Sequence, residues 1–256
     1  MMGTTQSVKA CCARVYASDA ARYLLGETFH PGGNALTDEL ARALDVAAGQ
    51  IVVDIASGPG TSAHLVAAST GCTVVGIDIV QASAAQSANL HGGVGRVRFV
   101  CGDAEALPLT HASVDGVLCE CAFCLFPDKR AAAREIARVL RPGARLALSD
   151  VTGDPARLPP VLRSLDAHVA CLAEALPLDS IAACLTEAGL TVERIHRRDD
   201  VIVPLLERIG ARLRFARLVG GTPLAEVSER AEQLLAAAWD AFRAGSIGYG
   251  VVVARR

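Results

Sequence analysis

Three cysteines lie within six residues of one another near the middle of the chain. Cys119, Cys121 and Cys124 follow an apolar run, residues 114–118, that we interpret as a buried strand, and they precede residues 130–140, whose pattern indicates an amphipathic helix. In an open α/β sheet, ligands bind in the crevice beyond the carboxyl ends of the strands. Thiolates are nucleophiles and ligands for soft metal ions. The sequence therefore predicts that these thiols either carry chemistry at that edge or pack there as small core residues.

The bulk composition limits the possible function classes. The chain has 256 residues, 52% of them hydrophobic, and a formal net charge of -2, so it can bury a core and has no excess of positive charge for nucleic acid. It begins with a polar segment, residues 1–9, and no run of about 18 apolar residues marks a membrane helix. We therefore expect a cytoplasmic protein with no nucleic-acid or membrane partner. Its nine cysteines, an odd number, argue against a disulfide framework.

A glycine-containing turn follows the first predicted strand, residues 50–55. Gly58 and Gly60 let the backbone turn sharply and come close to a ligand, because glycine has no Cβ atom. Taken alone, this turn also matches the dinucleotide fingerprint, with Asp78 about twenty residues further on. A structural turn without a ligand is the remaining alternative. The turn by itself therefore indicates a nucleotide-like ligand without identifying it.

Carboxylates follow three successive predicted strands and favour a cationic ligand over NAD. Asp54 would place a negative charge beside a pyrophosphate, which is unfavourable, whereas an amine or a sulfonium is compatible with it. Asp78 can accept hydrogen bonds from two ribose hydroxyls, and Asp103 can accept one from an adenine amino group. The three positions together suit an adenosine that carries an amino-acid tail.

The order of motifs along residues 49–151 resembles the class I S-adenosylmethionine-dependent methyltransferases. The matching pieces are Asp54-x-x-x-Gly58-x-Gly60, Asp78, residues 102–108 and residues 138–143. The resemblance implies S-adenosyl-L-methionine as the cofactor and a Rossmann-like, seven-stranded, mainly parallel sheet whose last strand is antiparallel. Alanine replaces the first glycine of the family motif, and because it is the smallest replacement we expect cofactor binding to survive. The implied cofactor-binding residues are Asp54, Ala56, Gly58, Gly60, Asp78, Ile79, Asp103, Ala104 and Cys119.

The thiol stretch is similar to that of the arsenite methyltransferases. Cys121 lies six residues before the tripeptide Pro127-Asp128-Lys129, the position at which that family binds trivalent arsenic. Cys171 heads a segment, residues 171–176, that resembles the family's stretch around its second arsenic-binding cysteine. The resemblance implies a third thiol from the N-terminal segment. The candidate catalytic and arsenic-binding cysteines are therefore Cys121, Cys171, Cys12 and Cys11, with Cys124 as a further arsenic ligand.

Thiolates are natural ligands for trivalent arsenic because both are soft. An arsenic atom held by three thiolates keeps a lone pair that can attack a sulfonium methyl group, so the protein has to supply positioning and a dry enclosure rather than a general base. A cellular thiol is the expected reductant. One alternative is methyl transfer to a small organic acceptor, such as a quinone-type carbon, an oxygen or a nitrogen, with the cysteines lining an apolar pocket. Another is a non-catalytic thiol module that binds metalloids.

Several remaining polar residues and thiols have structural interpretations. Because a negative charge beside a thiol disfavours the thiolate, we expect Glu120 to point outward or onto the cofactor. His30 and His168 match no standard zinc spacing, so we interpret both as structural or surface residues. The cysteines expected to be small core residues are Cys72, Cys101 and Cys184.

The alternation of strands and helices predicts a right-handed parallel α/β sheet. We expect an N-terminal helical cap (1–48), a cofactor-binding core (49–199), a helical insertion or lid (200–245) and a final strand of the core sheet (246–256). In the cap, Ser18 and Thr37 are predicted N-caps of helices over 19–25 and 38–44. Strands are expected over 50–55, 73–77, 97–101, 114–118, 145–149, 191–196 and 248–254. Further helices are expected over 62–70, 81–90, 130–140, 158–174, 179–188, 203–218 and 223–243.

Overall fold

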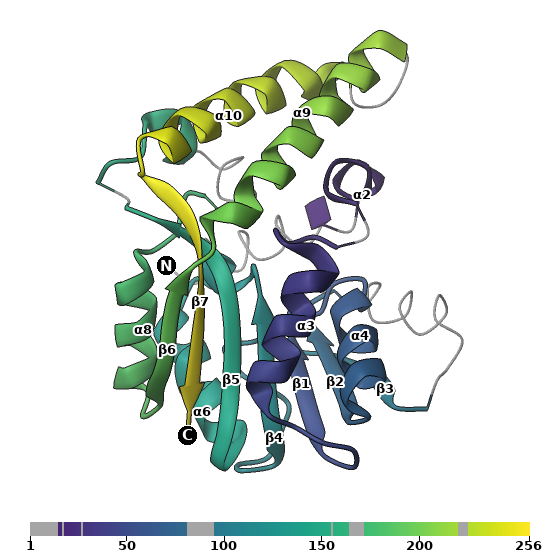
Figure 1. The fold of residues 1–256 in the computed structure, drawn as a ribbon, viewed down its shortest axis with the longest axis vertical. Helices are drawn as coiled ribbons and strands as arrows, with labels where there is room; N and C mark the ends of the chain where they lie inside the picture. The colour runs from purple at the N-terminus through teal and green to yellow at the C-terminus, as the bar shows by residue number, and fades with distance from the viewer. Residues whose placement is uncertain are drawn as a thin grey trace.

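The fold is described from a computed structural model (Figure 1). The residues that the structure describes are 15–16, 18–26, 28–80, 95–154, 156–163, 172–219 and 225–256. Several predictions fall outside these ranges and stay predictions: the roles of Cys11, Cys12, Cys171 and His168, and the helix over 81–90.

A seven-stranded sheet with the order β3-β2-β1-β4-β5-β7-β6 forms the centre of the molecule. The strands are β1 (Ile51–Ile55), β2 (Thr73–Asp78), β3 (Val97–Cys101), β4 (Val114–Glu120), β5 (Leu140–Gly153), β6 (Thr191–Arg197) and β7 (Ile247–Arg255). Strand β7 runs antiparallel to both of its neighbours, β5 and β6, whereas β1 to β5 pair in parallel. The predicted Rossmann-like sheet with an antiparallel last strand is therefore confirmed.

Helices cover both faces of the sheet. They are α2 (Asp19–Leu25), α3 (Gly33–Leu44), α4 (Thr61–Thr70), α6 (Lys129–Val139), α8 (Leu178–Glu187), α9 (Ile202–Val219) and α10 (Ala225–Arg243), with short 3-10 helices η1 (Phe123–Leu125), η2 (Pro160–Arg163) and η3 (Asp199–Val201). One buried cluster joins α3 and α4 to the sheet, and a second joins α6 and α8 to its other face. This two-faced burial explains why the central strands are apolar throughout.

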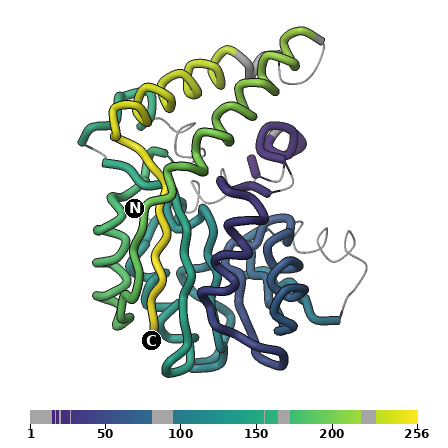
Figure 2. Tube along the Cα trace, viewed as in Figure 1, coloured from purple at the N-terminus to yellow at the C-terminus, as the bar shows by residue number. Residues whose placement is uncertain are grey.

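The helices α9 and α10 lie between β6 and β7 in the chain and extend beyond one end of the sheet (Figure 1). The Cα trace shows α2 beside α9 (Figure 2), and the hydroxyl of Tyr23 donates to the carbonyl oxygen of Arg212 at 3.3 Å. The N-terminal segment and the insertion therefore touch each other. A lid function for residues 200–245 stays a prediction.

Several local predictions are wrong, each for a physical reason. Helix α3 begins at Gly33, so Thr37 lies inside it rather than capping it, and its buried hydroxyl bonds to a side chain on β4. In the expected helix over 158–174, the described residues form only η2, because Pro159 and Pro160 disfavour helical backbone in the residues before them. Cys101 is exposed rather than buried, because β3 is an edge strand.

Candidate active site

A cavity opens at the carboxyl ends of β1, β2, β3 and β4 and is covered by residues from the N-terminal segment. Counted out to the solvent at its mouth, the space between its walls is about 1320 Å³. The strand register brings these ends together, because Ile55 of β1 pairs with Ile77 of β2 and with Cys119 of β4. Residues from the ends of four neighbouring strands therefore border one cavity.

Asp54 forms part of the cavity wall near the end of β1 and is 2% exposed. Its Oδ2 atom has no hydrogen-bond partner. Burial raises the pKa of Asp54 well above its ordinary value, and the negative charges of Glu120 and Asp78 raise it further. A buried carboxyl group without a donor is costly, so this position fits a ligand that brings a cationic or hydrogen-bonding group.

The turn after β1 has left-handed backbone at three positions. Gly58 and Gly60 have φ values of +50° and +83°, and Gly60 is the N-cap of α4. Ala56 also has a positive φ, +58°, in a region that L-residues other than glycine adopt only at a cost. This conformation explains why a glycine would be the ordinary residue at position 56.

Asp78 ends β2 and faces the same turn. Its Oδ2 accepts the backbone N–H of Gly58, and its Oδ1 accepts that of Val80, both at 2.8 Å. Burial raises the pKa of Asp78, while these two hydrogen bonds act in the opposite direction. Each carboxylate oxygen has a further lone pair, so Asp78 can hold the turn in place and still accept a hydroxyl group from a ligand.

The segment after β3 contributes Gly102, Asp103 and Ala104 to the cavity wall. Asp103 Oδ1 accepts the backbone N–H of Glu105 at 3.0 Å, which fixes the direction of the carboxylate. A Cβ atom on Gly102 would lie 2.8 Å from Pro108 Cδ, so only glycine fits between β3 and the following loop.

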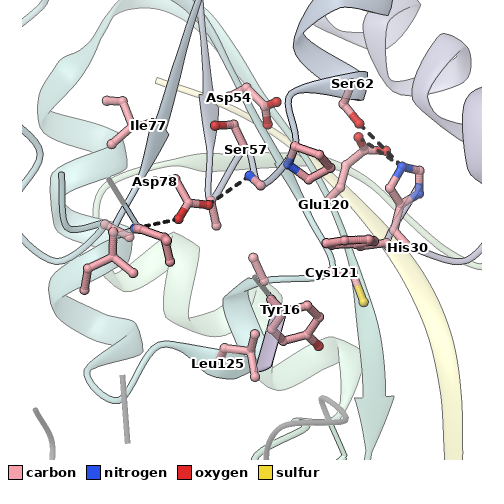
Figure 3. Close-up of a pocket in the computed structure, with 18 of the residues that line it drawn as sticks. Tyr16, His30, Asp54, Ser57, Ser62, Ile77, Asp78, Glu120, Cys121 and Leu125 are labelled. Atoms are coloured by element: carbon pink, nitrogen blue, oxygen red, sulfur yellow. Dashed lines mark hydrogen bonds and ion pairs between the residues drawn. The ribbon is translucent and has the colours of Figure 1, made fainter. Parts of the chain in front are cut away.

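Cys121 follows β4 and lines the cavity. Its backbone has φ +50°, and its N–H donates to the carbonyl oxygen of Ser149 on β5 at 2.7 Å. Figure 3 shows Cys121, Tyr16 and His30 toward one end of the cavity and Asp78 toward the other. The left-handed backbone directly after β4 thus directs the Cys121 side chain into the cavity. Cys121 lies at the end away from Asp78, the residue predicted to bind ribose.

The other two thiols of the stretch are not among the described residues that line the cavity. Cys119 is fully buried, and burial together with nearby carboxylates raises the pKa of its thiol well above the ordinary value. Cys124 is buried in η1, where its N–H donates to Asp150 Oδ2 at 2.7 Å. Of the three cysteines in this stretch, Cys121 therefore lines the cavity, whereas Cys119 and Cys124 are buried outside its wall.

Glu120 and His30 line the cavity although neither is among the site residues expected from the sequence. Of the two directions expected for Glu120, outward or onto the cofactor, the outward one is wrong: its side chain is 4% exposed and lies on the cavity wall. The Thr37 hydroxyl donates to its two oxygens at 3.0 and 3.2 Å, and His30 Nε2 lies 3.6 Å from Oε2. His30 is buried and lies within 3.4 Å of the Ser62 hydroxyl. A His-Pro-Gly-Gly turn before α3 was the available signal for His30.

Aromatic side chains form much of the remaining wall. Tyr16 and Phe29, from the N-terminal segment, have ring centroids 6.0 Å apart, and Phe126 packs edge-on against Phe123 at 5.9 Å. Such walls exclude water and strengthen electrostatic interactions inside the cavity.

Comparison with known proteins agrees with this architecture. A family model described as a methyltransferase domain matches residues 53–148. The 27-O-demethylrifamycin SV methyltransferase of Amycolatopsis mediterranei is 34% identical over 193 residues, which cover 69% of this chain and 71% of that protein. This chain belongs to the class I S-adenosylmethionine-dependent methyltransferases. Its cofactor is S-adenosyl-L-methionine, which is present in solved methyltransferases of similar fold.

An arsenite methyltransferase of Halobacterium salinarum is 32% identical to this methyltransferase over 159 residues, 60% of this chain and 41% of that protein. The matches to the first curated relatives span about half of those relatives' own length. The cyclopropane synthase MmaA2 of Mycobacterium tuberculosis shares the fold with a TM-score of 0.81 at 19% identity, covering 99% of both chains. The Amycolatopsis relative shows the family, and MmaA2 shows the fold. The names of these relatives indicate different methyl acceptors.

The described residues fit the cofactor of the family. The unpartnered oxygen of Asp54 offers an acceptor to a cationic group, and a Cβ atom at Gly58 would come within 3.9 Å of Phe29, which leaves the turn open to a ligand. Among these residues, no group of three or more histidine, cysteine or acidic side chains is arranged to hold a metal ion. No helix in the described ranges is long and apolar enough to cross a membrane.

Proposed function

We propose that this methyltransferase transfers the methyl group of S-adenosylmethionine to trivalent arsenic bound by thiolates, with arsenite or methylarsenite as the substrate. The products are methylated arsenicals and S-adenosylhomocysteine. The observation that carries the proposal is the position of Cys121, because within the described part of the chain it is the cysteine whose side chain borders the cofactor cavity. It is also the residue that the arsenite methyltransferase pattern selects.

The cofactor, when bound, supplies an electrophilic methyl group on a sulfonium. Asp54 would face its cationic methionine end, Asp78 its ribose, and Asp103 with Ala104 its adenine. Asp78 already orients the turn through its hydrogen bonds to Gly58 and Val80. These assignments leave the end of the cavity near Cys121 for the acceptor.

Cys121 would hold arsenic through its thiolate, together with thiolates from Cys171 and from Cys11 or Cys12. The hydrogen bond from the Cys121 N–H to Ser149 fixes the backbone that carries the thiol. Tyr16 and Phe29, whose rings line the cavity wall, would help to exclude water from the site. Held in this way, arsenic needs no base, since its lone pair is the nucleophile, and the protein contributes orientation and enclosure.

Methyl transfer to a small organic acceptor is the second candidate function, and two features of the cavity wall suit such an acceptor. The aromatic side chains of Tyr16, Phe29 and Phe126 suit a flat apolar molecule, and Glu120 offers a carboxylate that can accept a proton from a hydroxyl group. Curated relatives include O-methyltransferases and a demethylmenaquinone methyltransferase.

The test is incubation of the full chain with isotopically labelled S-adenosylmethionine, a thiol and arsenite, with the products analysed by mass. We expect labelled methylarsenicals from the wild type and loss of at least about 99% of them in Cys121→Ser, since a ligand of the reacting atom is removed. The matched control is Cys184→Ser, on α8 and outside the cavity wall, which should methylate normally.

Three results would speak against the proposal. Unchanged methylation in Cys121→Ser would overturn the role of this thiol. Transfer of label to a phenol or a quinol, with none to arsenic, would establish the second candidate. Stoichiometric arsenite binding without turnover would instead indicate a non-catalytic thiol module.

A further inference from the structure

The charged side chains of the cavity wall are mostly acidic. In the described part of the chain the wall carries four carboxyl groups, those of Asp54, Asp78, Asp103 and Glu120, and one guanidinium, that of Arg22. The family cofactor needs acidic groups at its methionine, ribose and adenine ends, which accounts for the three aspartates. The cofactor does not account for Glu120, which lies on the wall next to Cys121, the thiol that would hold the acceptor.

Glu120 is built into the wall rather than being a mobile surface carboxylate. Its side chain is 4% exposed, and the Thr37 hydroxyl, itself buried inside α3, donates to both of its oxygens. His30 Nε2 approaches one oxygen at 3.6 Å and is held in place by a contact of Nδ1 with the Pro31 carbonyl oxygen at 3.0 Å. A carboxylate fixed in this way cannot turn away from an incoming acceptor.

A second observation shows that the field of Glu120 reaches into the cavity. Asp54, on the same wall, is almost fully buried and its Oδ2 has no hydrogen-bond partner. The charge of Glu120 is the second cause, after burial, of the raised pKa of Asp54. A charge that opposes the ionisation of Asp54 would also oppose an anionic acceptor in the same cavity, since screening by water is weak in a buried site.

We propose that Glu120 makes the acceptor end of this cavity selective for uncharged or cationic trivalent arsenicals and against anionic ones. This inference rests on the function proposed above. It implies that arsenic arrives as uncharged arsenite, as methylarsenite, or as a complex with a neutral thiol. A complex with a thiol that carries several carboxylates would be repelled.

The ligand exchange that loads arsenic needs no anion in the cavity. When a cysteine thiol replaces a hydroxyl of arsenite, an As–S bond forms and an As–O bond breaks. The departing hydroxyl takes the proton of the thiol and leaves as water. The arsenic stays trivalent, and the reactants and products of each exchange are uncharged, so uncharged arsenite meets no electrostatic barrier from Glu120.

The test compares two probes that differ by one carboxylate, phenylarsine oxide and 4-carboxyphenylarsine oxide. Their binding to the cofactor-free full chain is measured by calorimetry, and the part that is lost in Cys121→Ser reports the cavity. We expect the wild type to bind the uncharged probe at least about tenfold more tightly, from the repulsion between like charges at short range. In Glu120→Gln this ratio should fall at least about threefold. Glu187→Gln, a surface change on α8 that alters net charge equally, should leave the ratio unchanged.

The possible outcomes separate this inference from the function on which it rests. Equal binding of the two probes, lost in Cys121→Ser, would overturn the charge selection and leave the arsenic site standing. A ratio that is the same in Glu120→Gln and in the wild type would overturn the role of Glu120. Binding that does not depend on Cys121 would overturn the proposed function, and the inference with it.

Discussion

Glu120 and Cys121 are adjacent in the chain, and both side chains line the same cavity. Successive residues of a strand point to opposite faces, so this arrangement requires a break in the strand. The break is the left-handed backbone of Cys121, φ +50°, which is stabilised by the hydrogen bond from its N–H to Ser149. Strain of this kind is found preferentially at functional sites, and here it places a carboxylate and a thiol side by side.

Ala56→Gly should stabilise the protein. Ala56 has φ +58°, a conformation that costs a non-glycine residue about 1–2 kcal/mol, partly offset by the greater backbone entropy of glycine in the unfolded chain. The free energy of unfolding, measured by urea titration, should rise by about 0.5–1 kcal/mol.

Ala112→Gly is the matched control for this prediction, because Ala112 also has a left-handed φ, +49°, but lies outside the described cavity wall. We expect the same gain in stability there and unchanged cofactor affinity in both variants. A loss of stability in Ala56→Gly would mean that the methyl group of Ala56 contributes packing that the backbone strain does not outweigh.

Asp54→Asn should stabilise the cofactor-free protein at neutral pH and weaken cofactor binding. The pKa of Asp54 is raised on folding, so the native state retains a proton that the unfolded state releases. The stability of the wild type should therefore fall as the pH rises from the ordinary aspartate pKa through the raised native value. An asparagine side chain does not ionise, so this part of the pH dependence should disappear in the variant, with a gain at neutral pH of about 1–3 kcal/mol.

Thermal unfolding of the wild type and Asp54→Asn across pH, with and without S-adenosylmethionine, measures both effects. Asp38→Asn, an acidic residue of α3 outside the described cavity wall, is a suitable control for the change in net charge. If Asp54→Asn bound the cofactor as tightly as the wild type, Asp54 would have no role at the cationic end of the cofactor.

Asp150→Asn should loosen the segment that carries Cys121. Asp150 is fully buried, and its two oxygens accept the N–H groups of Cys124 and Val151, both at 2.7 Å. An asparagine presents an NH₂ group to one of these donors, so we expect a loss of about 1–3 kcal/mol in stability. Arsenical binding should weaken more than cofactor binding, because the thiol segment moves while the glycine turn does not.

Asp154→Asn provides the comparison for Asp150, since Asp154 follows β5 and its Oδ1 accepts a local N–H, that of Ala156, at 3.0 Å. Calorimetric titration with phenylarsine oxide and with S-adenosylmethionine gives the two affinities separately. Equal losses of both affinities in Asp150→Asn would indicate general destabilisation instead of a role in positioning Cys121.

The position of three aspartates on one cavity wall was predictable because its signals are local. Each of Asp54, Asp78 and Asp103 lies at the end of an apolar run or directly after it, and parallel strands place such ends at one edge of the sheet. The parallel part of the sheet followed from the alternation of strand and helix patterns, and the antiparallel last strand from the family resemblance. The cysteine at position 121 was likewise marked by the Pro-Asp-Lys tripeptide that follows it.

The acceptor side was harder to predict because it depends on non-local contacts. Cys121 faces the same cavity as Glu120 because its backbone is left-handed, and this backbone is held by a hydrogen bond to another strand. Thr37 has the chemistry of an N-cap, yet the preceding Gly32, with φ +83°, lets α3 begin earlier and places Thr37 opposite Glu120. His30 reaches the cavity through the same turn. No pattern within a short window contains these relationships.

The central claim is that arsenic is held by the Cys121 thiolate in the cofactor cavity, and X-ray absorption at the arsenic edge tests it most directly. The full-length wild type, Cys121→Ser and Cys184→Ser would be loaded with one equivalent of arsenite. We predict an all-sulfur shell around arsenic in the wild type and in Cys184→Ser, with one sulfur neighbour replaced by oxygen in Cys121→Ser. The same arsenic environment in Cys121→Ser and in the wild type would contradict the account.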